Sequence, residues 1–184
     1  MNHKDPFLRI LAAIAFSARH HLGQIRKDNK TPYVSHPFRV TFILRDLFEV
    51  ADHDTLTACV LHDTLEDTLA DFDDLEEEFG HKIAEWVAML SKDPRLPEEK
   101  REALYCDVLA KAPWQVQVCK LADVYDNLLD STTFDPKKRL KAIKKKRQYM
   151  DAIATGLKPE AKKALLQTLK VYDELIENCQ KQAE

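Results

Sequence analysis

The sequence predicts an all-α fold, a compact bundle of about eight to nine helices. Its 184 residues contain only 3 glycines and 8 prolines for turns, and 32% of them are charged residues, mostly of helix-favouring types. Apolar residues recur at helical spacing along most of the chain, and no segment alternates as a strand would. At this length, we expect a single domain that spans residues 1–184.

Breaker residues divide the periodic segments into lengths typical of helices. Asp54 and Asp135 are candidate N-caps, and Gly23 and Gly80 mark expected helix ends. The expected helices span residues 6–24, about 37–47, about 54–67, 71–79, 81–90, 98–112, 114–129, about 136–153, and 159 to near the C-terminus.

Composition excludes several classes of protein. The net charge of −3 provides no basic field of the kind that binds nucleic acid. No apolar run is long enough to cross a bilayer, and the first ten residues lack the pattern of a signal peptide. The four cysteines show no CxxC spacing, so we expect reduced thiols. We therefore expect a cytoplasmic protein that contacts neither membranes nor nucleic acid.

The strongest functional signal is the segment CVLHDTLED, residues 59–67. It opens apolar and then carries His62, Asp63, Glu66 and Asp67. On a continuous helix, residues four apart share a face, so His62 would stack over Glu66 and Asp63 over Asp67. Ionisable groups in an apolar setting are unfavourable unless they are paired or bound to metal. This segment therefore predicts a polar site within the core.

Two further residues complete a possible metal-binding set. His36 follows a polar loop and precedes Pro37, and Asp123 follows an apolar run in VCKLADVYDN. With His62 and Asp63 they would form a set of two histidines and two aspartates, which suits manganese, iron or zinc with positions left open for water. Spacing alone does not establish that these three segments converge, because a lone histidine is more often structural than a ligand.

The roles of Glu66 and Asp67 stay open on residue chemistry alone. Beside a metal centre, either carboxylate would accept a proton from the attacking water. In the alternative interpretation, the two residues belong to a solvent-exposed acidic turn, since acidic residues continue through Glu78.

Three motifs resemble those of a known family. HHLGQIRKDNKTPYVSHP, LHDTLEDT and KLADVYDN occur in this order between residues 12 and 131. They are similar to the motifs of the HD-superfamily hydrolase domain of the Rel/Spo alarmone proteins. The length of the chain resembles that of the stand-alone small alarmone hydrolases of metazoan type.

The resemblance implies an enzyme that hydrolyses guanosine tetraphosphate or pentaphosphate, (p)ppGpp, to pyrophosphate and GDP or GTP. It implies that one Mn²⁺, or alternatively Fe²⁺ or Zn²⁺, is bound by His36, His62, Asp63 and Asp123. It further implies that Glu66 and Asp67 assist the attacking water.

The same resemblance implies three substrate-binding residues. Arg26 would pack on the nucleotide base, Lys27 would lie near the phosphates, and Asn127 would contact the ribose region. A guanidinium group stacks on a planar ring, and an ammonium group meets phosphate as a point charge, so both residue types suit a nucleotide substrate.

Three positions differ from the usual family pattern. Val124 stands where a basic residue is usual, Asp126 where His or Tyr is usual, and Leu129 where an arginine is usual. An added acid and two fewer cations near a phosphate-rich ligand keep other substrates open. These are adenosine alarmones, (p)ppApp, or another nucleotide such as NADPH, and the alternative activities are those of an HD-type nucleotidase or NADPH phosphatase.

A basic run at residues 136–147 has two interpretations. It is typical of a solvated helix face. Alternatively, Lys137, Lys138 or Arg139 reaches the 5′ phosphates of the substrate and replaces the cation missing at Leu129.

Overall fold

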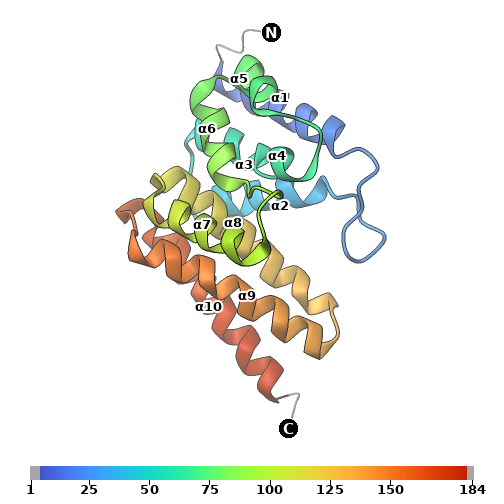
Figure 1. The fold of residues 1–184 in the computed structure, drawn as a ribbon, viewed down its shortest axis with the longest axis vertical. Helices are drawn as coiled ribbons and strands as arrows, with labels where there is room; N and C mark the ends of the chain where they lie inside the picture. Colours follow the sequence, from blue (N-terminus) through green and yellow to red (C-terminus); the bar gives the residue numbers. More distant parts are fainter. Residues whose placement is uncertain (1–4, 182–184) are drawn as a thin grey trace.

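The computed structural model describes residues 5–181, and within them all side chains except those of Thr133, Pro136 and Lys137. Over this range the prediction of an all-α bundle is confirmed (Figure 1). Nine α-helices of at least eight residues are present, together with the single-turn helix α4, and the described residues form no strand beyond one isolated bridge between Ile25 and Pro32.

The helices follow one another through short connections. They are α1 (Pro6–His20), α2 (Ser35–Phe42), α3 (His53–Leu61), α4 (Thr64–Asp67), α5 (Phe72–Phe79), α6 (His81–Leu90), α7 (Glu98–Lys111), α8 (Trp114–Asp130), α9 (Pro136–Thr155) and α10 (Lys162–Lys181). A π-helical turn (Ile43–Leu47) extends α2, and two 3₁₀ turns (Ser131–Thr133 and Pro159–Ala161) precede α9 and α10.

Aspartate caps begin several of these helices. The Asp71 side chain caps α5 in a reciprocal capping box with Asp74, and Asp135 caps α9 as predicted. The expected cap of α3 was wrong by two residues, because Asp52 accepts the hydrogen bond from the Thr55 N–H. Asp54 instead lies in the first turn of α3.

The predicted continuous helix through the CVLHDTLED segment is wrong. Helix α3 ends at Leu61, and the chain turns at His62 and Asp63 before α4 begins. The Thr64 hydroxyl donates to the Leu61 carbonyl at 2.7 Å, a bond that satisfies one terminal carbonyl of α3. His62 therefore does not stack over Glu66. The turn separates the buried His62 from Glu66 and Asp67, which lie on α4.

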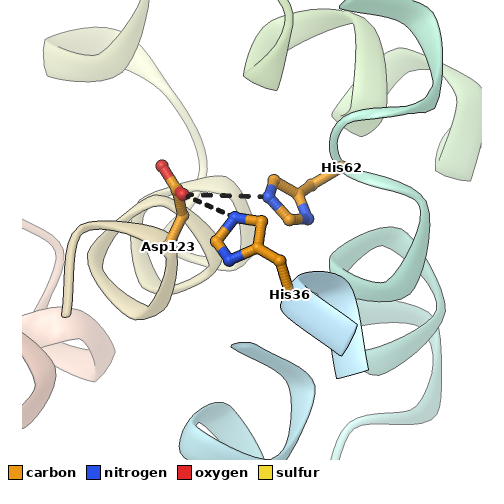
Figure 2. Close-up of side chains that lie close together, drawn as sticks. All are labelled: His36, His62 and Asp123. Carbon is orange, nitrogen blue, oxygen red and sulfur yellow. Dashed lines mark hydrogen bonds and ion pairs between the residues drawn. The ribbon is translucent and has the colours of Figure 1, made fainter. Parts of the chain in front are cut away.

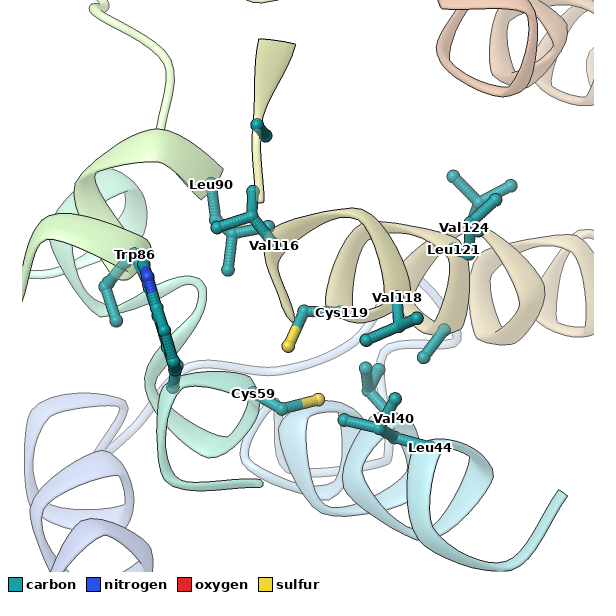
Figure 3. Close-up of a cluster of buried hydrophobic side chains, with 14 of the residues drawn as sticks. Val40, Leu44, Cys59, Trp86, Leu90, Val116, Val118, Cys119, Leu121 and Val124 are labelled. Carbon is teal, nitrogen blue, oxygen red and sulfur yellow. The ribbon is translucent and has the colours of Figure 1, made fainter. Parts of the chain in front are cut away.

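Helix α8 is the central element of the core. It packs against α2, α3, α6 and α10, and eleven of its 17 residues are buried. Figure 3 shows its Val118 and Cys119 facing Cys59 of α3 and Leu44 of the π-helical turn. All four cysteines are free thiols, as expected. In Figure 1, α8 lies between the N-terminal helices and the pair α9 and α10.

Among residues 5–181, no helix has the length and apolar character needed to span a membrane.

Candidate active site

Four side chains from three segments converge where α2, the α3–α4 turn and α8 meet. His36 Nε2 lies 3.2 Å from Asp123 Oδ1 and 3.5 Å from Asp63 Oδ2. His62 Nε2 lies 3.1 Å from Asp63 Oδ2 and 3.9 Å from Asp123 Oδ1. Figure 2 shows both imidazole rings directed at the Asp123 carboxylate. The predicted convergence of these residues is thus present in the fold.

The Nδ1 atom of each imidazole forms the hydrogen bond that orients its ring. His36 Nδ1 lies 2.7 Å from an oxygen of Asp126, and His62 Nδ1 lies 2.9 Å from the Cys59 carbonyl. Because both of these partners are acceptors, each Nδ1 carries the proton, and each Nε2 keeps its lone pair in the neutral ring. His62 Nε2 is buried and has no hydrogen-bond partner among the described residues. When both rings are neutral, two imidazole lone pairs and two carboxylates therefore face one point.

The electrostatics of this cluster favour a cation. Burial lowers the pKa of His62, but the carboxylates of Asp63 and Asp123 outweigh burial and raise the pKa to about 10. Burial also lowers the pKa of His36, and hydrogen bonds with Asp123 and Asp126 raise it above its usual value. The two histidines hold the pKa of Asp63 below its ordinary range despite burial. The donor set therefore fits a divalent metal ion, which would replace the protons that the cluster otherwise retains.

A second layer of charged residues holds these four side chains. Asp126 is fully buried, and besides His36 it pairs with Arg39 Nε at 2.7 Å. We counted Asp126 as an added acid near a phosphate-rich ligand, but its carboxylate is engaged by His36 and Arg39. Its helical position, three residues after Asp123, directs it to the back of His36, where it orients the ring.

Lys120 and Asn127 bind Asp123 from either side along α8. Lys120 Nζ lies 2.7 Å from Asp123 Oδ2. Asn127 Nδ2 donates to the Asp123 carbonyl at 3.0 Å and also to its carboxylate. The structure thus places Asn127 beside the metal-ligand candidate, and its predicted contact with ribose stays a prediction.

Glu66 and Asp67 lie next to the cluster in different surroundings. Burial raises the pKa of the Glu66 carboxyl above its usual value, even though Lys92 lowers it. Glu66 also accepts a hydrogen bond from the Lys92 backbone N–H at 3.1 Å. A carboxyl with a raised pKa suits proton transfer near neutral pH. The interpretation of a freely exposed acidic turn therefore does not describe Glu66.

Tyr33 and His21 are site residues that sequence reasoning missed. The Tyr33 hydroxyl lies 2.6 Å from Asp63 Oδ2 and 2.9 Å from Asp67 Oδ2, so it links a metal-ligand candidate to a catalytic candidate. The His21 ring lies 5.0 Å from the Tyr33 ring, and its buried Nε2 has no partner within the described part of the chain. Both residues lie within the motif HHLGQIRKDNKTPYVSHP, and their place in this motif is the signal that could have identified them as site residues.

A cavity of about 240 Å³ adjoins this cluster. Its walls come from the loop after α1, the C-terminal half of α8 and helix α9. The lining residues are Ile25, Arg26, Lys27, Tyr33, Asn127, Leu128, Asp130, Ser131, Phe134, Ala142, Ile143 and Lys146. All three predicted substrate-binding residues therefore line one cavity.

The two predicted cations of this cavity are engaged by protein groups. Arg26 binds the Asp130 carboxylate through Nε at 3.1 Å, and its guanidinium carbon lies 5.6 Å from the centre of the Tyr33 ring. Lys27 Nζ lies 5.7 Å from the centre of the Phe134 ring. A nucleotide base in this cavity would lie near the Tyr33 and Phe134 rings and the Arg26 guanidinium group.

The remaining sequence expectations have mixed outcomes. Val124 is buried in the core and Leu129 is 39% exposed, and neither lines the cavity. Arg139 donates to the carbonyls of Ser131, Thr132 and Phe134, so it closes the turn before α9. Lys138 lies over the Phe134 ring, and the side chain of Lys137 lies outside the described atoms.

Residues 13–178 match the family model described as HD domain. The guanosine-3′,5′-bis(diphosphate) 3′-pyrophosphohydrolase MESH1 of Danio rerio is 36% identical over 128 residues, which cover 69% of this chain and 71% of the relative. The Homo sapiens protein of the same name is 36% identical over 129 residues, or 70% and 72% of the two chains. The bifunctional (p)ppGpp synthase/hydrolase SpoT of Escherichia coli K12 is 31% identical over 160 residues, which cover 84% of this chain and 22% of SpoT.

Solved structures with the same fold include the following two. A metazoan ortholog of SpoT, described as hydrolysing ppGpp and as having a role in starvation responses, superposes with a TM-score of 0.81 and 27% identity, covering 90% of this chain and 94% of that one. A protein of Listeria monocytogenes superposes with a TM-score of 0.63 and 23% identity over 79% of this chain and 96% of its own.

Proposed function

Because the chain belongs to the HD-domain family, we propose that it is a metal-dependent phosphohydrolase of nucleotide alarmones. Its reaction would be that of a guanosine-3′,5′-bis(diphosphate) 3′-pyrophosphohydrolase, the name carried by relatives that are 36% identical. The observation that carries this proposal is the juxtaposition of the His36, His62, Asp63 and Asp123 cluster with a cavity lined by cations and aromatic rings.

We assign His36, His62, Asp63 and Asp123 as ligands of one Mn²⁺ ion. Two imidazole nitrogens and two carboxylates form a mixed set of borderline and hard donors, which manganese accepts. Fe²⁺ and Zn²⁺ suit the same donors and are the alternatives. When bound, the ion would polarise phosphate oxygens and lower the pKa of a coordinated water.

The chain's own residues supply the proton transfers and the orientation of the substrate. Glu66 would accept the proton of the attacking water, since its carboxyl lies beside the cluster and burial raises its pKa above the usual value. Asp67, held by the Tyr33 hydroxyl, would assist in positioning that water. Arg26 would stack on the base, Lys27 would offset phosphate charge, and Asn127 would contact the ribose region while holding Asp123.

The proposed reaction balances without a further reactant. The water oxygen bonds to the phosphorus attached to the ribose 3′ oxygen, and the bond between that phosphorus and the 3′ oxygen breaks. One proton of the water passes to a carboxylate, and a proton returns to the 3′ oxygen. The products are pyrophosphate and GDP or GTP.

The position of Asp126 in the structure bears on which substrate we propose. Its carboxylate is buried behind His36 and pairs with Arg39, so it adds no unpaired negative charge to the cavity. This placement removes one of the reasons for preferring an adenosine alarmone or NADPH. Guanosine alarmones are therefore our first choice, and the other nucleotides are arms of the test.

The test is a product assay of the manganese-loaded protein on ppGpp, ppApp and NADPH in parallel, with Asp63→Ala as the inactive control. We expect pyrophosphate and GDP from ppGpp, resolved by ion-exchange chromatography. Orthophosphate as the product would identify a different HD phosphohydrolase, such as a nucleotidase or NADPH phosphatase. Saturable binding with no product in the presence of Mn²⁺ would identify a nucleotide sensor and refute the enzyme.

A further inference from the structure

The cavity contains a third cation, Lys146, which comes from α9. Its side chain is partly buried, and it lines the same wall as Ala142 and Ile143 of that helix. We propose that Lys146 binds a phosphate group of the substrate other than the one under attack, and that it thereby selects nucleotides with several phosphates. This inference rests on the proposed function for the identity of the nucleotide, but its anion-binding chemistry does not.

Lys146 differs from the other cations of the cavity in its partners. Arg26 is bound to Asp130, and Lys27 lies over Phe134. Among the described residues, Lys146 Nζ forms no ion pair with a carboxylate, and it lies 5.8 Å from the centre of the Tyr149 ring. An ammonium group without an anionic partner in a partly buried position is unfavourable, and a phosphate would supply that partner.

The surrounding charges point to the same ligand. Burial lowers the pKa of Lys146, the Asp123 carboxylate raises it, and the ammonium groups of Lys120, Lys92 and Lys27 lower it again, to about 8. Four ammonium groups thus share one region, and the Asp123 carboxylate is already paired with Lys120. Lys92 pairs with Glu66 and Glu102, so Lys146 differs from Lys92 and Lys120 in having no carboxylate partner among the described residues, and a phosphate of the substrate would supply one.

The position of Lys146 explains why a phosphate outside the cleaved bond is the assigned ligand. Its electrostatic neighbours include Asp123 at the metal cluster and Lys27 at the outer loop. Lys146 also lines the same cavity as Lys27 and as Asn127, which holds Asp123. The ligand is either the terminal phosphate of the 3′ diphosphate or a phosphate of the 5′ group, since both have the same chemistry.

The two cations next to Lys146 on α9 form ion pairs with carboxylates. Lys145 pairs with Glu98 at 2.6 Å, and Arg147 pairs with Asp151 at 2.7 Å. Lys144 is exposed and does not line the cavity. Lys144 is therefore a matched control, because it has the same charge on the same helix, two positions away.

The experiment compares Lys146→Met, Lys146→Arg and Lys144→Met with the manganese-loaded wild type. Calorimetry measures the Kd of inorganic pyrophosphate, and kinetics measure KM and kcat for ppGpp and for guanosine 5′-monophosphate 3′-diphosphate. In Lys146→Met we expect the Kd and KM to rise about 10-fold or more, as for loss of a charge-assisted hydrogen bond, with a smaller change in kcat. Lys146→Arg should recover most of the affinity, and Lys144→Met should match the wild type.

The two substrates separate the two possible phosphates. A KM effect on ppGpp that disappears for the 5′-monophosphate assigns Lys146 to the 5′ terminal phosphate, and an equal effect on both assigns it to the 3′ diphosphate. Thermal unfolding tests a merely structural role. Removal of an unpaired cation should leave the Tm unchanged or raise it, whereas loss of a structural contact would lower it.

The results that overturn the proposal are distinct from those that overturn the function. Pyrophosphate and ppGpp parameters of Lys146→Met within twofold of the wild type would refute the role of Lys146 while turnover stands. Weakened pyrophosphate binding without any turnover by the wild type would refute the function while the anion site stands. If Lys146→Met does not fold, Lys146→Gln provides the same comparison, because it keeps a polar side chain without the charge.

Discussion

The metal cluster and the adjoining cavity differ in how far they are prepared for a ligand. In the cluster, Asp126 and the Cys59 carbonyl fix the two imidazole rings, and both Nε2 atoms already face the carboxylates. In the cavity, by contrast, Arg26 is occupied by Asp130 and Lys27 lies over an aromatic ring. A metal ion would enter a preformed site, whereas a nucleotide would exchange one set of partners for another.

This difference follows from burial. The cluster lies among core residues of α2, α3 and α8, and the Nδ1 atom of each histidine has a defined hydrogen-bond acceptor there. The cavity borders the loop after α1, and the Asp130 carboxylate that pairs with Arg26 is 25% exposed, so a ligand reaches this ion pair more readily than it reaches the buried cluster. We therefore expect changes in the cluster to lower activity strongly on every substrate. Changes in the cavity should have smaller effects that depend on the substrate.

The largest effect is expected from Asp63→Ala or Asp123→Ala. Each change removes a carboxylate from the cluster, so we expect activity to fall by about 1,000-fold or more, because the charge stabilisation by a metal ion is worth several kcal/mol. Turnover assays and metal analysis by mass spectrometry measure both consequences. Asp46→Ala, at an exposed carboxylate, is the control. Wild-type turnover in either cluster variant would refute the assignment.

Glu66→Gln should separate catalysis from metal binding. The amide cannot accept a proton, so we expect kcat to fall roughly 100-fold while the metal content stays at the wild-type level. The measurement is kcat together with metal content on the same preparation. An unchanged rate would remove Glu66 from the mechanism and leave Asp67 as the candidate base.

Asp126→Asn tests whether Asp126 holds the His36 ring in the orientation that metal binding needs. Loss of the buried carboxylate behind His36 should weaken metal affinity by about 10- to 100-fold, as for other residues that orient a ligand. Competition with a chelating dye measures the affinity. An unchanged affinity would show that His36 keeps its orientation without Asp126, and the contrast between the two regions would lose its main support.

The pH dependence of the wild type tests Lys146 through its charge. Because its pKa is lowered from 10.5 to about 8, the ammonium form predominates below that pH and is lost as the pH rises through it. We expect kcat/KM for ppGpp, which reports the free enzyme, to fall above about pH 8. Lys146→Arg should abolish this decline, since arginine stays charged. An identical decline in both proteins would assign it to another group.

The smallest effect is expected from Asp130→Asn. The change loosens the ion pair that engages Arg26 and Arg39, so a nucleotide would displace less on binding. We expect KM to fall by about two- to fivefold with kcat unchanged, in line with the modest strength of partly exposed ion pairs. Steady-state kinetics measure this shift. A rise in KM would show that Asp130 positions Arg26 for the substrate and does not compete with it.

Local patterns in the chain were sufficient for much of the fold. The spacing of apolar residues predicts α6 without error, from His81 to Leu90, and predicts α5, α7 and α8 to within about one residue at each end. The sharp turn at His62 and Asp63 escaped this reasoning. The turn contains the hydrogen bond from the Thr64 hydroxyl to the Leu61 carbonyl and buries His62, and neither feature is visible as a period in the sequence.

By itself, the sequence determined the helical class, the order of the helices and the residue types capable of holding a metal ion, because these follow from short-range spacing and side-chain chemistry. Only the tertiary structure decided that Asp126 lies behind His36, that Tyr33 links Asp63 to Asp67, and that Lys146 enters the cavity beside Arg26. Each of these relations joins segments that are remote in the chain or depends on which face of a helix is covered. The packing of α8 against α2, α3 and α9 sets those distances and that burial, and no local pattern encodes them.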